Sequence, residues 1–193
     1  MKLIGPKSIS TGLSYLFLSV FIFLLLYTIY KSFLLSIGWY NYTYSENLLP
    51  NLVKTGKAPA DNPTDLQTYL KFRFPFFKEF VHTYLNGKIS FVSVFTNVFS
   101  TLFFFFAYKI FRELNKPTLF NKKIIKKLKA FSIINFIYAP VYILSIKILF
   151  KTGLESSMII SCFAFTFLGL ISYFIMVFFQ NAYQLQSEND LTI

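Results

Sequence analysis

Cysteine and histidine, two of the main ligands of structural zinc, are almost absent from this chain of 193 residues. The one cysteine, Cys162, lies inside an apolar run, so an intrachain disulfide is excluded and a packing role is expected. The one histidine, His82, has no cysteine or second histidine near it, and a zinc site takes three or four such ligands or carboxylates. We therefore expect no metal site and place His82 at a polar edge of a loop.

Carboxylates are scarce as well, because 8 Asp and Glu residues face 19 Lys and Arg residues, for a formal net charge of +11. The sequence has no paired histidines with a glutamate, no serine elbow, no glycine-rich phosphate loop and no clustered carboxylates. A membrane enzyme usually needs two polar groups that converge at one depth. We expect a protein that is not an enzyme, with no catalytic residue and no cofactor.

Apolar residues make up 55% of the chain and aromatic residues 21%, whereas charged residues reach only 14%. An ordinary soluble domain carries about 25% charged residues. The composition excludes a disordered chain, a disulfide scaffold and an ordinary soluble domain, and it indicates a membrane protein.

Four apolar runs have about the 20 residues that a helix needs to cross a lipid core of about 30 Å. They cover residues 13–30, 89–111, 131–150 and 157–179, and none contains a carboxylate. The first run lacks the small-residue cleavage pattern of a signal peptide, so we interpret it as an uncleaved membrane helix. The sequence predicts an all-α membrane protein with four transmembrane helices.

The segment between the first two runs, residues 31–88, is mixed in character and has a turn-rich stretch from Lys54 to Pro63. Its flanks, Ile37–Tyr44 and Tyr69–Phe74, have the aromatic composition of strands. They allow a small β-hairpin in this loop. An interfacial helix fits Ser32–Tyr40 about as well.

Basic residues are densest between the second and third runs, where eight lie within the 21 residues from Lys109 to Lys129. Only Glu113 opposes them. The positive-inside rule places this basic connector, residues 112–130, in the cytoplasm. Total basic charge on the two sides is nearly equal, so the assignment depends on density. Both termini and the tail, residues 180–193, then lie in the cytoplasm, and residues 31–88 form an extracytoplasmic loop.

The basic connector predicts an amphipathic helix that begins at Lys122, with Asn121 as its cap and with Ile124, Ile125 and Leu128 on one face. Its candidate docking residues are Lys116, Lys122, Lys123, Lys126, Lys127 and Lys129. They suit anionic lipid headgroups, or else an acidic or regulatory protein. Direct nucleic-acid binding is not expected, because the lysines lie within a turn of the membrane and no readout module is present.

Three residues inside the apolar runs are candidates for an intramembrane polar or kinked site: Asn97, Asn135 and Pro140. They either line a small polar path or join helices to one another. On the fourth run, small residues recur at helical spacing: Cys162, Thr166, Gly169 and Ser172. This small face is expected to pack against a neighbouring span or against a second copy of the chain, which would form a homo-oligomer.

The last candidate feature is the tail motif Glu188, Asn189, Asp190, Leu191, Thr192 and Ile193. Residues 180–185 can continue the fourth helix by a turn or two, after which the acidic end either folds back onto the basic connector or frays.

This ending, together with the connector FRELNKPTLFNKKIIKKLKAF, resembles the bacterial membrane proteins grouped as domain of unknown function 2975. That family has about four predicted helices, a basic second loop with a glycine-proline-phenylalanine turn, and an acidic pair followed by Leu-Thr-Ile. Here Lys116 stands where glycine is usual, and two residues separate Pro117 from Phe120. The resemblance is general in the spans, and residues 1–88 match little. It supplies no catalytic residue, and it implies a partnership with the small helix-turn-helix regulators that are often encoded beside family members.

We therefore expect a non-enzymatic regulatory or sensory protein of the bacterial inner membrane that holds a cytoplasmic partner, with a small helix-turn-helix transcription regulator as one candidate. The alternatives are a small-solute transporter or channel component, and an accessory or immunity subunit of a membrane complex.

Overall fold

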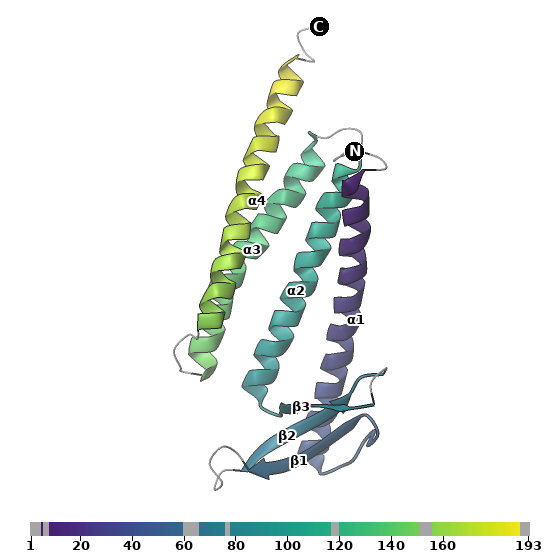
Figure 1. Cartoon of the computed structure of the whole chain (residues 1–193). Helices are drawn as coiled ribbons and strands as arrows, with labels where there is room; N and C mark the ends of the chain where they lie inside the picture. Colours follow the sequence, from purple (N-terminus) through teal and green to yellow (C-terminus); the bar gives the residue numbers. More distant parts are fainter. Residues whose placement is uncertain are drawn as a thin grey trace. The chain divides into compact units, whose positions relative to one another are not determined.

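The computed structural model describes residues 5, 8–59, 66–75, 78–116, 120–150 and 156–189. Its elements are, in chain order, α1 (Ile9–Tyr44), β1 (Val53–Pro59), β2 (Leu66–Arg73), β3 (Phe80–Tyr84), α2 (Gly87–Leu114), α3 (Lys122–Phe150) and α4 (Ser156–Asn189), as Figure 1 shows. The chain forms two compact units. Unit 1 comprises Met1–Leu24 and Val98–Ile193, and unit 2 comprises Leu25–Asn97.

All four helices are long and apolar enough to cross a membrane, which confirms the predicted fold class of a multi-pass, mostly helical membrane protein. Their aromatic and β-branched residues would favour strands in water, but in lipid a helix satisfies every backbone group within itself. The helices extend beyond the apolar runs. The 36 residues of α1 measure about 54 Å, well over the roughly 30 Å of a lipid core.

The predicted strand over Ile37–Tyr44 is wrong, because α1 continues through these residues, and the helical alternative for Ser32–Tyr40 is confirmed. The extension is stabilised by burial, since Leu34 is fully buried and Asn41 is only 2% exposed. Asn41 also stabilises the turn that follows α1. Its Nδ2 donates to the Leu48 carbonyl at 3.0 Å, and its Oδ1 accepts from the Leu48 amide at 2.9 Å.

Between α1 and α2, the described part of unit 2 forms a three-stranded antiparallel sheet in the order β1-β2-β3, rather than a simple hairpin. The strand predicted over Tyr69–Phe74 is confirmed as far as Arg73 in β2, whereas His82 lies on β3 and not at the edge of a loop. In register, Val53 pairs with Phe72, and Leu70 pairs with Thr83.

One face of the sheet packs against α1. Side chains alternate between the two faces of a strand, and Val53, Leu70 and Phe72 share the buried face. They join Leu34 of α1 in one apolar cluster. Gly38 permits this approach, because a Cβ at that position would overlap the Leu70 side chain.

Unit 1 contains the start of α1, most of α2 and all of α3 and α4. The helices α3 and α4 lie side by side (Figure 1). Its core is apolar and aromatic. It comprises Ala107, Ile110, Ile124, Leu128, Phe131 and Met176. Around this core the Phe17 and Phe111 rings lie 5.0 Å apart, and the Phe103 and Phe131 rings also lie 5.0 Å apart. These ring contacts connect α2 to both α1 and α3.

Candidate functional site

The basic connector begins on the last turn of α2, where Glu113 is only 3% exposed. Its carboxylate accepts a hydrogen bond from the Lys127 Nζ on α3 and pairs with the Lys116 Nζ at 2.8 Å. A carboxylate that is removed from water needs such charged partners. Glu113, the one acidic residue among the eight basic residues of Lys109–Lys129, is therefore an anchor that connects the end of α2 to the first turns of α3.

Asn121 caps α3 as predicted. Its Oδ1 accepts from the amides of Lys123 at 2.9 Å and Ile124 at 3.0 Å, and α3 begins at Lys122. A cap of this kind satisfies amides that have no partner within the helix. The residues between Lys116 and Phe120 lie outside the described part of the chain, so the predicted turn there is not described.

The six candidate lysines fall into two groups. Lys116 and Lys127 are held by Glu113, and the Lys122 Nζ lies 5.8 Å from the centre of the Tyr183 ring, within the range of a cation–π interaction. Lys123, Lys126 and Lys129 are exposed, and no carboxylate among the residues that the structure describes lies within ion-pair distance of them.

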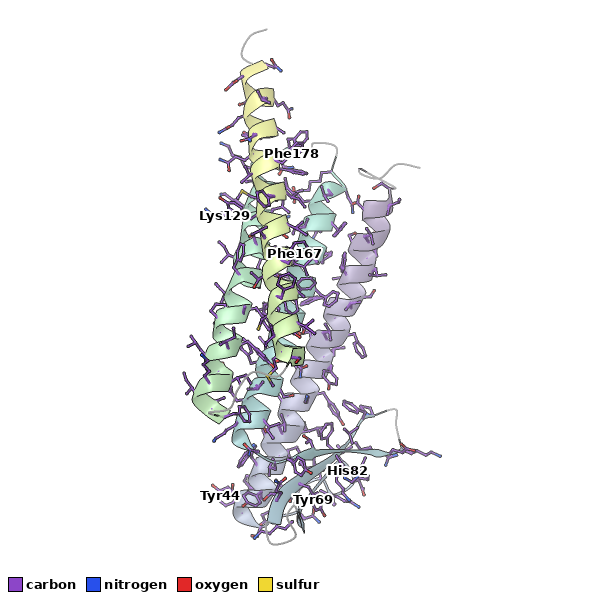
Figure 2. The ribbon with its side chains drawn as sticks, turned by 60° about the vertical axis from the view of Figure 1, so that its left-hand side comes forward. Tyr44, Tyr69, His82, Lys129, Phe167 and Phe178 are labelled. Atoms are coloured by element: carbon purple, nitrogen blue, oxygen red, sulfur yellow. The ribbon has the colours of Figure 1, made fainter. Side chains whose placement is uncertain are left out.

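The exposed lysines lie opposite the buried stripe of α3. Lys122, Lys126 and Lys129 follow the i, i+4, i+7 spacing of one row on a helix, whereas Ile124 and Leu128 face the core. Lys129, labelled in Figure 2, belongs to the exposed row. Because Lys122 remains exposed beside Tyr183, the row presents three cations in a fixed register.

The other helices of unit 1 also reach this end. The Ser10 Oγ on α1 donates to the Asn115 Oδ1 at 2.6 Å, just after α2 ends, and the Asn115 Nδ2 donates to the Ser14 Oγ at 3.2 Å. The ring of Phe120, which directly precedes Asn121 and α3, lies 5.2 Å from the ring of Phe179 on α4. The start of α1, the end of α2, the start of α3 and the later turns of α4 thus meet around the basic connector.

The helical extension of α4 is confirmed and runs to Asn189. Residues 184–189 are all exposed, among them Leu185, whose side chain is 63% exposed. Glu188 and Asn189 of the tail motif form the last residues of this helix. Asp190, Leu191, Thr192 and Ile193, on which the choice between fold-back and fraying of the tail depends, lie outside the described residues.

The intramembrane candidates do not belong to one unit, since Asn97 is in unit 2 whereas Asn135 and Pro140 are in unit 1. Asn135 is fully buried on α3, and its Nδ2 donates to the Phe131 carbonyl at 2.8 Å. Its Oδ1 is buried with no hydrogen-bond partner in the described part of the chain. Pro140 lies inside α3, where it removes one backbone hydrogen bond.

Asn135 lies where α3 approaches α4 at Gly169. A Cβ placed on Gly169 would be 3.2 Å from the Asn135 Cβ and 3.3 Å from the Ser132 carbonyl oxygen. The Ser132 Oγ donates to the Gly169 carbonyl at 2.8 Å. The small face of α4 therefore packs against a neighbouring span here, and the Ser132 hydroxyl joins α3 to α4, whereas the Asn135 amide bonds within α3.

The opposite side of α4 is rich in exposed aromatic residues of the kind that face lipid. They are Phe163, Phe167, Phe174 and Phe178, of which Phe167 and Phe178 are labelled in Figure 2. A homo-oligomer through α4 would have to use this side, because α3 already covers Gly169.

The model of one protein family, described as Protein of unknown function (DUF2975), matches residues 57–193. The match reaches back to the end of β1 and includes β2 and β3, beyond the connector and the tail that carry the resemblance. No curated protein and no solved structure matches the chain. The family match covers more than two thirds of the sequence, and the chain belongs to the family Protein of unknown function (DUF2975).

Proposed function

We propose that this protein is a non-enzymatic regulatory or sensory protein of the bacterial inner membrane, whose basic connector faces the cytoplasm and holds a cytoplasmic partner there. The observation that supports this proposal most is the row of exposed lysines on the first turns of α3, which Glu113 ties to α2 and which begins beside Tyr183 of α4. A surface that is prearranged in this way loses little conformational entropy when a partner binds.

The lysine row and the projecting helix have different chemical preferences. Lys129 lies next to the apolar part of α3 and suits anionic headgroups, at about 1 kcal/mol for a lysine near the membrane surface. Lys123, Lys126 and Leu185 offer two cations and an exposed apolar side chain to a protein. The partner is therefore an acidic protein with an apolar contact, and the family resemblance adds a small helix-turn-helix regulator as a candidate.

The orientation is tested by labelling single cysteines in a Cys162→Ser chain. We expect a membrane-impermeant maleimide on intact spheroplasts to label a cysteine at position 54 but not one at position 126, because dense basic segments stay in the cytoplasm. Both positions should react once the membrane is permeabilised. Labelling of position 126 on intact spheroplasts would reverse the proposed topology.

The docking surface is tested by capture of partners from native membranes after crosslinking. We expect K123E/K126E to lower recovery of the main cytoplasmic partner about tenfold or more, since two favourable charge pairs become repulsive. The matched control K54E/K57E makes the same charge change on β1 and should leave recovery unchanged.

A second variant separates protein docking from headgroup binding. Leu185→Ser should weaken partner capture while leaving flotation with anionic liposomes unchanged, because the substitution removes an apolar contact and no charge. Full recovery of the partner with both K123E/K126E and Leu185→Ser would contradict the proposed surface. So would a wild-type protein that captures no cytoplasmic protein above empty membranes.

A further inference from the structure

The sheet has a second face that the α1 contact leaves available. Tyr69 pairs across the strands with Tyr84, and Lys71 pairs with His82, so four side chains form a square on one side of β2 and β3. They border a groove of about 420 Å³, within the usual range for small-ligand sites. The lining comprises Tyr69, Lys71, His82, Thr83 and Tyr84. Tyr69 and His82 are labelled on the sheet in Figure 2.

This face is cationic. Of the four Lys and Arg residues of the three strands, Lys54, Lys71 and Arg73 lie on this face by register, and the strands contain no acidic residue. The Lys71 Nζ lies 5.0 Å from the centre of the Tyr69 ring, and the Lys54 Nζ lies 5.1 Å from that of Phe80. Neither lysine forms an ion pair with a carboxylate among the described residues. Two cations are thus positioned over aromatic rings with their charge open to an anion.

The aromatic part of the groove has a fixed side and an exposed side. A Cβ on Gly56 would lie 2.5 Å from the Tyr69 Cζ and 2.8 Å from its Cε1, so the ring lies directly across the glycine of the neighbouring strand. Tyr84, on β3, is 49% exposed. The Tyr69 ring is therefore held in place by its packing, and the Tyr84 ring is accessible to a ligand.

We propose that this groove binds an anionic saccharide, with the sugar ring against the tyrosines and its acidic group at Lys71 and His82. The tyrosine faces supply apolar contact for a ring, and the phenol hydroxyls and the imidazole supply hydrogen bonds for sugar hydroxyls. Lys71 supplies the charge that a phosphate or carboxylate group requires. The two pairs lie two residues apart along each strand, or about 7 Å, which matches a single ring with one acidic substituent.

The test uses calorimetric titration of the full chain in a neutral detergent, with glucose 6-phosphate, glucose and inorganic phosphate as probes. We expect glucose 6-phosphate to bind more tightly than either of the others. Lys71→Ala should weaken it about tenfold or more, as expected for the loss of a charge-assisted hydrogen bond. Lys57→Ala removes the same charge from the opposite face of the sheet and should change the affinity less than about twofold.

The ring contact is tested separately with Tyr84→Ala, because replacing Tyr69 would disturb the packing over Gly56. This variant should weaken glucose 6-phosphate about fivefold and leave inorganic phosphate unchanged. Equal loss in Lys71→Ala and Lys57→Ala would show general charge attraction and overturn the site. Equal affinity for inorganic phosphate and glucose 6-phosphate, or no heat with any probe, would overturn it as well.

Discussion

Glu113→Gln is expected to lower the free energy of unfolding of unit 1 by about 2 kcal/mol. Glutamine keeps the size of the side chain but cannot neutralise the two lysines that Glu113 holds. Loss of one partner from a fully buried ion pair costs about 3–5 kcal/mol. The cost is smaller here because Lys116 is 47% exposed and Lys127 is 27% exposed, so both ammonium groups can regain water.

The measurement is the unfolding midpoint in detergent, by heat and by added SDS, with Glu46→Gln as the matched control. Glu46 is an exposed carboxylate of unit 2, and its replacement should leave the midpoint unchanged. A double-mutant cycle with Lys127→Met identifies the partner, because Glu113→Gln should cost much less when Lys127 is already absent. Equal costs in both backgrounds would show that Glu113 is not an anchor for α3.

Gly169→Leu is expected to lower the free energy of unfolding by about 3 kcal/mol and to separate α3 from α4. Even the first added carbon would sit 3.2 Å from the Asn135 Cβ and 3.3 Å from a backbone oxygen, which is tighter than ordinary contact. The larger side chain also pushes the Ser132 hydroxyl away from the Gly169 carbonyl, at a further cost of about 1 kcal/mol or less.

The matched control is Gly12→Leu, because a Cβ at Gly12 meets nothing within 4 Å. Both substitutions add the same side chain to a membrane helix, so a lower midpoint confined to Gly169→Leu isolates the contact between α3 and α4. Gly169→Ala should fall between wild type and Gly169→Leu. A midpoint for Gly169→Leu equal to that of Gly12→Leu would refute tight packing at this position.

The membrane helices were predictable because about 20 consecutive apolar residues have few stable alternatives in a chain of this length. The cap on α3 was predictable for a similar local reason, since Asn121 directly precedes an amphipathic run. Both predictions depend on neighbouring residues alone, and the structure confirms both.

The end of α1 and the full sheet were not predictable in the same way. Trp39, Tyr40, Tyr42 and Tyr44 favour strands by composition, and Gly56 and Pro59 obscure β1. What decides the outcome is tertiary: Leu34 of α1 packs with Val53 and Leu70 of the sheet in one apolar cluster. Contacts between residues so far apart leave no local pattern.

The candidate site was predicted in part. The density of lysine identified the basic connector, but it could not tell which lysines are held internally and which are exposed. The one available signal was Glu113, the single acid in the run. Its burial against Lys127 depends on how α2 meets α3, and a sequence does not specify that angle.

The hydrogen bond between Ser10 and Asn115 has a consequence for the order in which the protein is made. It joins residues 105 positions apart, so it cannot form until α1, the sheet and α2 have left the ribosome. α3 and α4 are consecutive helices, and their contact at Gly169 needs only the last part of the chain. Local contacts form faster than distant ones. During synthesis, the start of α1 therefore remains without its contact at the end of α2 until at least 105 further residues have been made, whereas α3 and α4 can pair as soon as both are inserted.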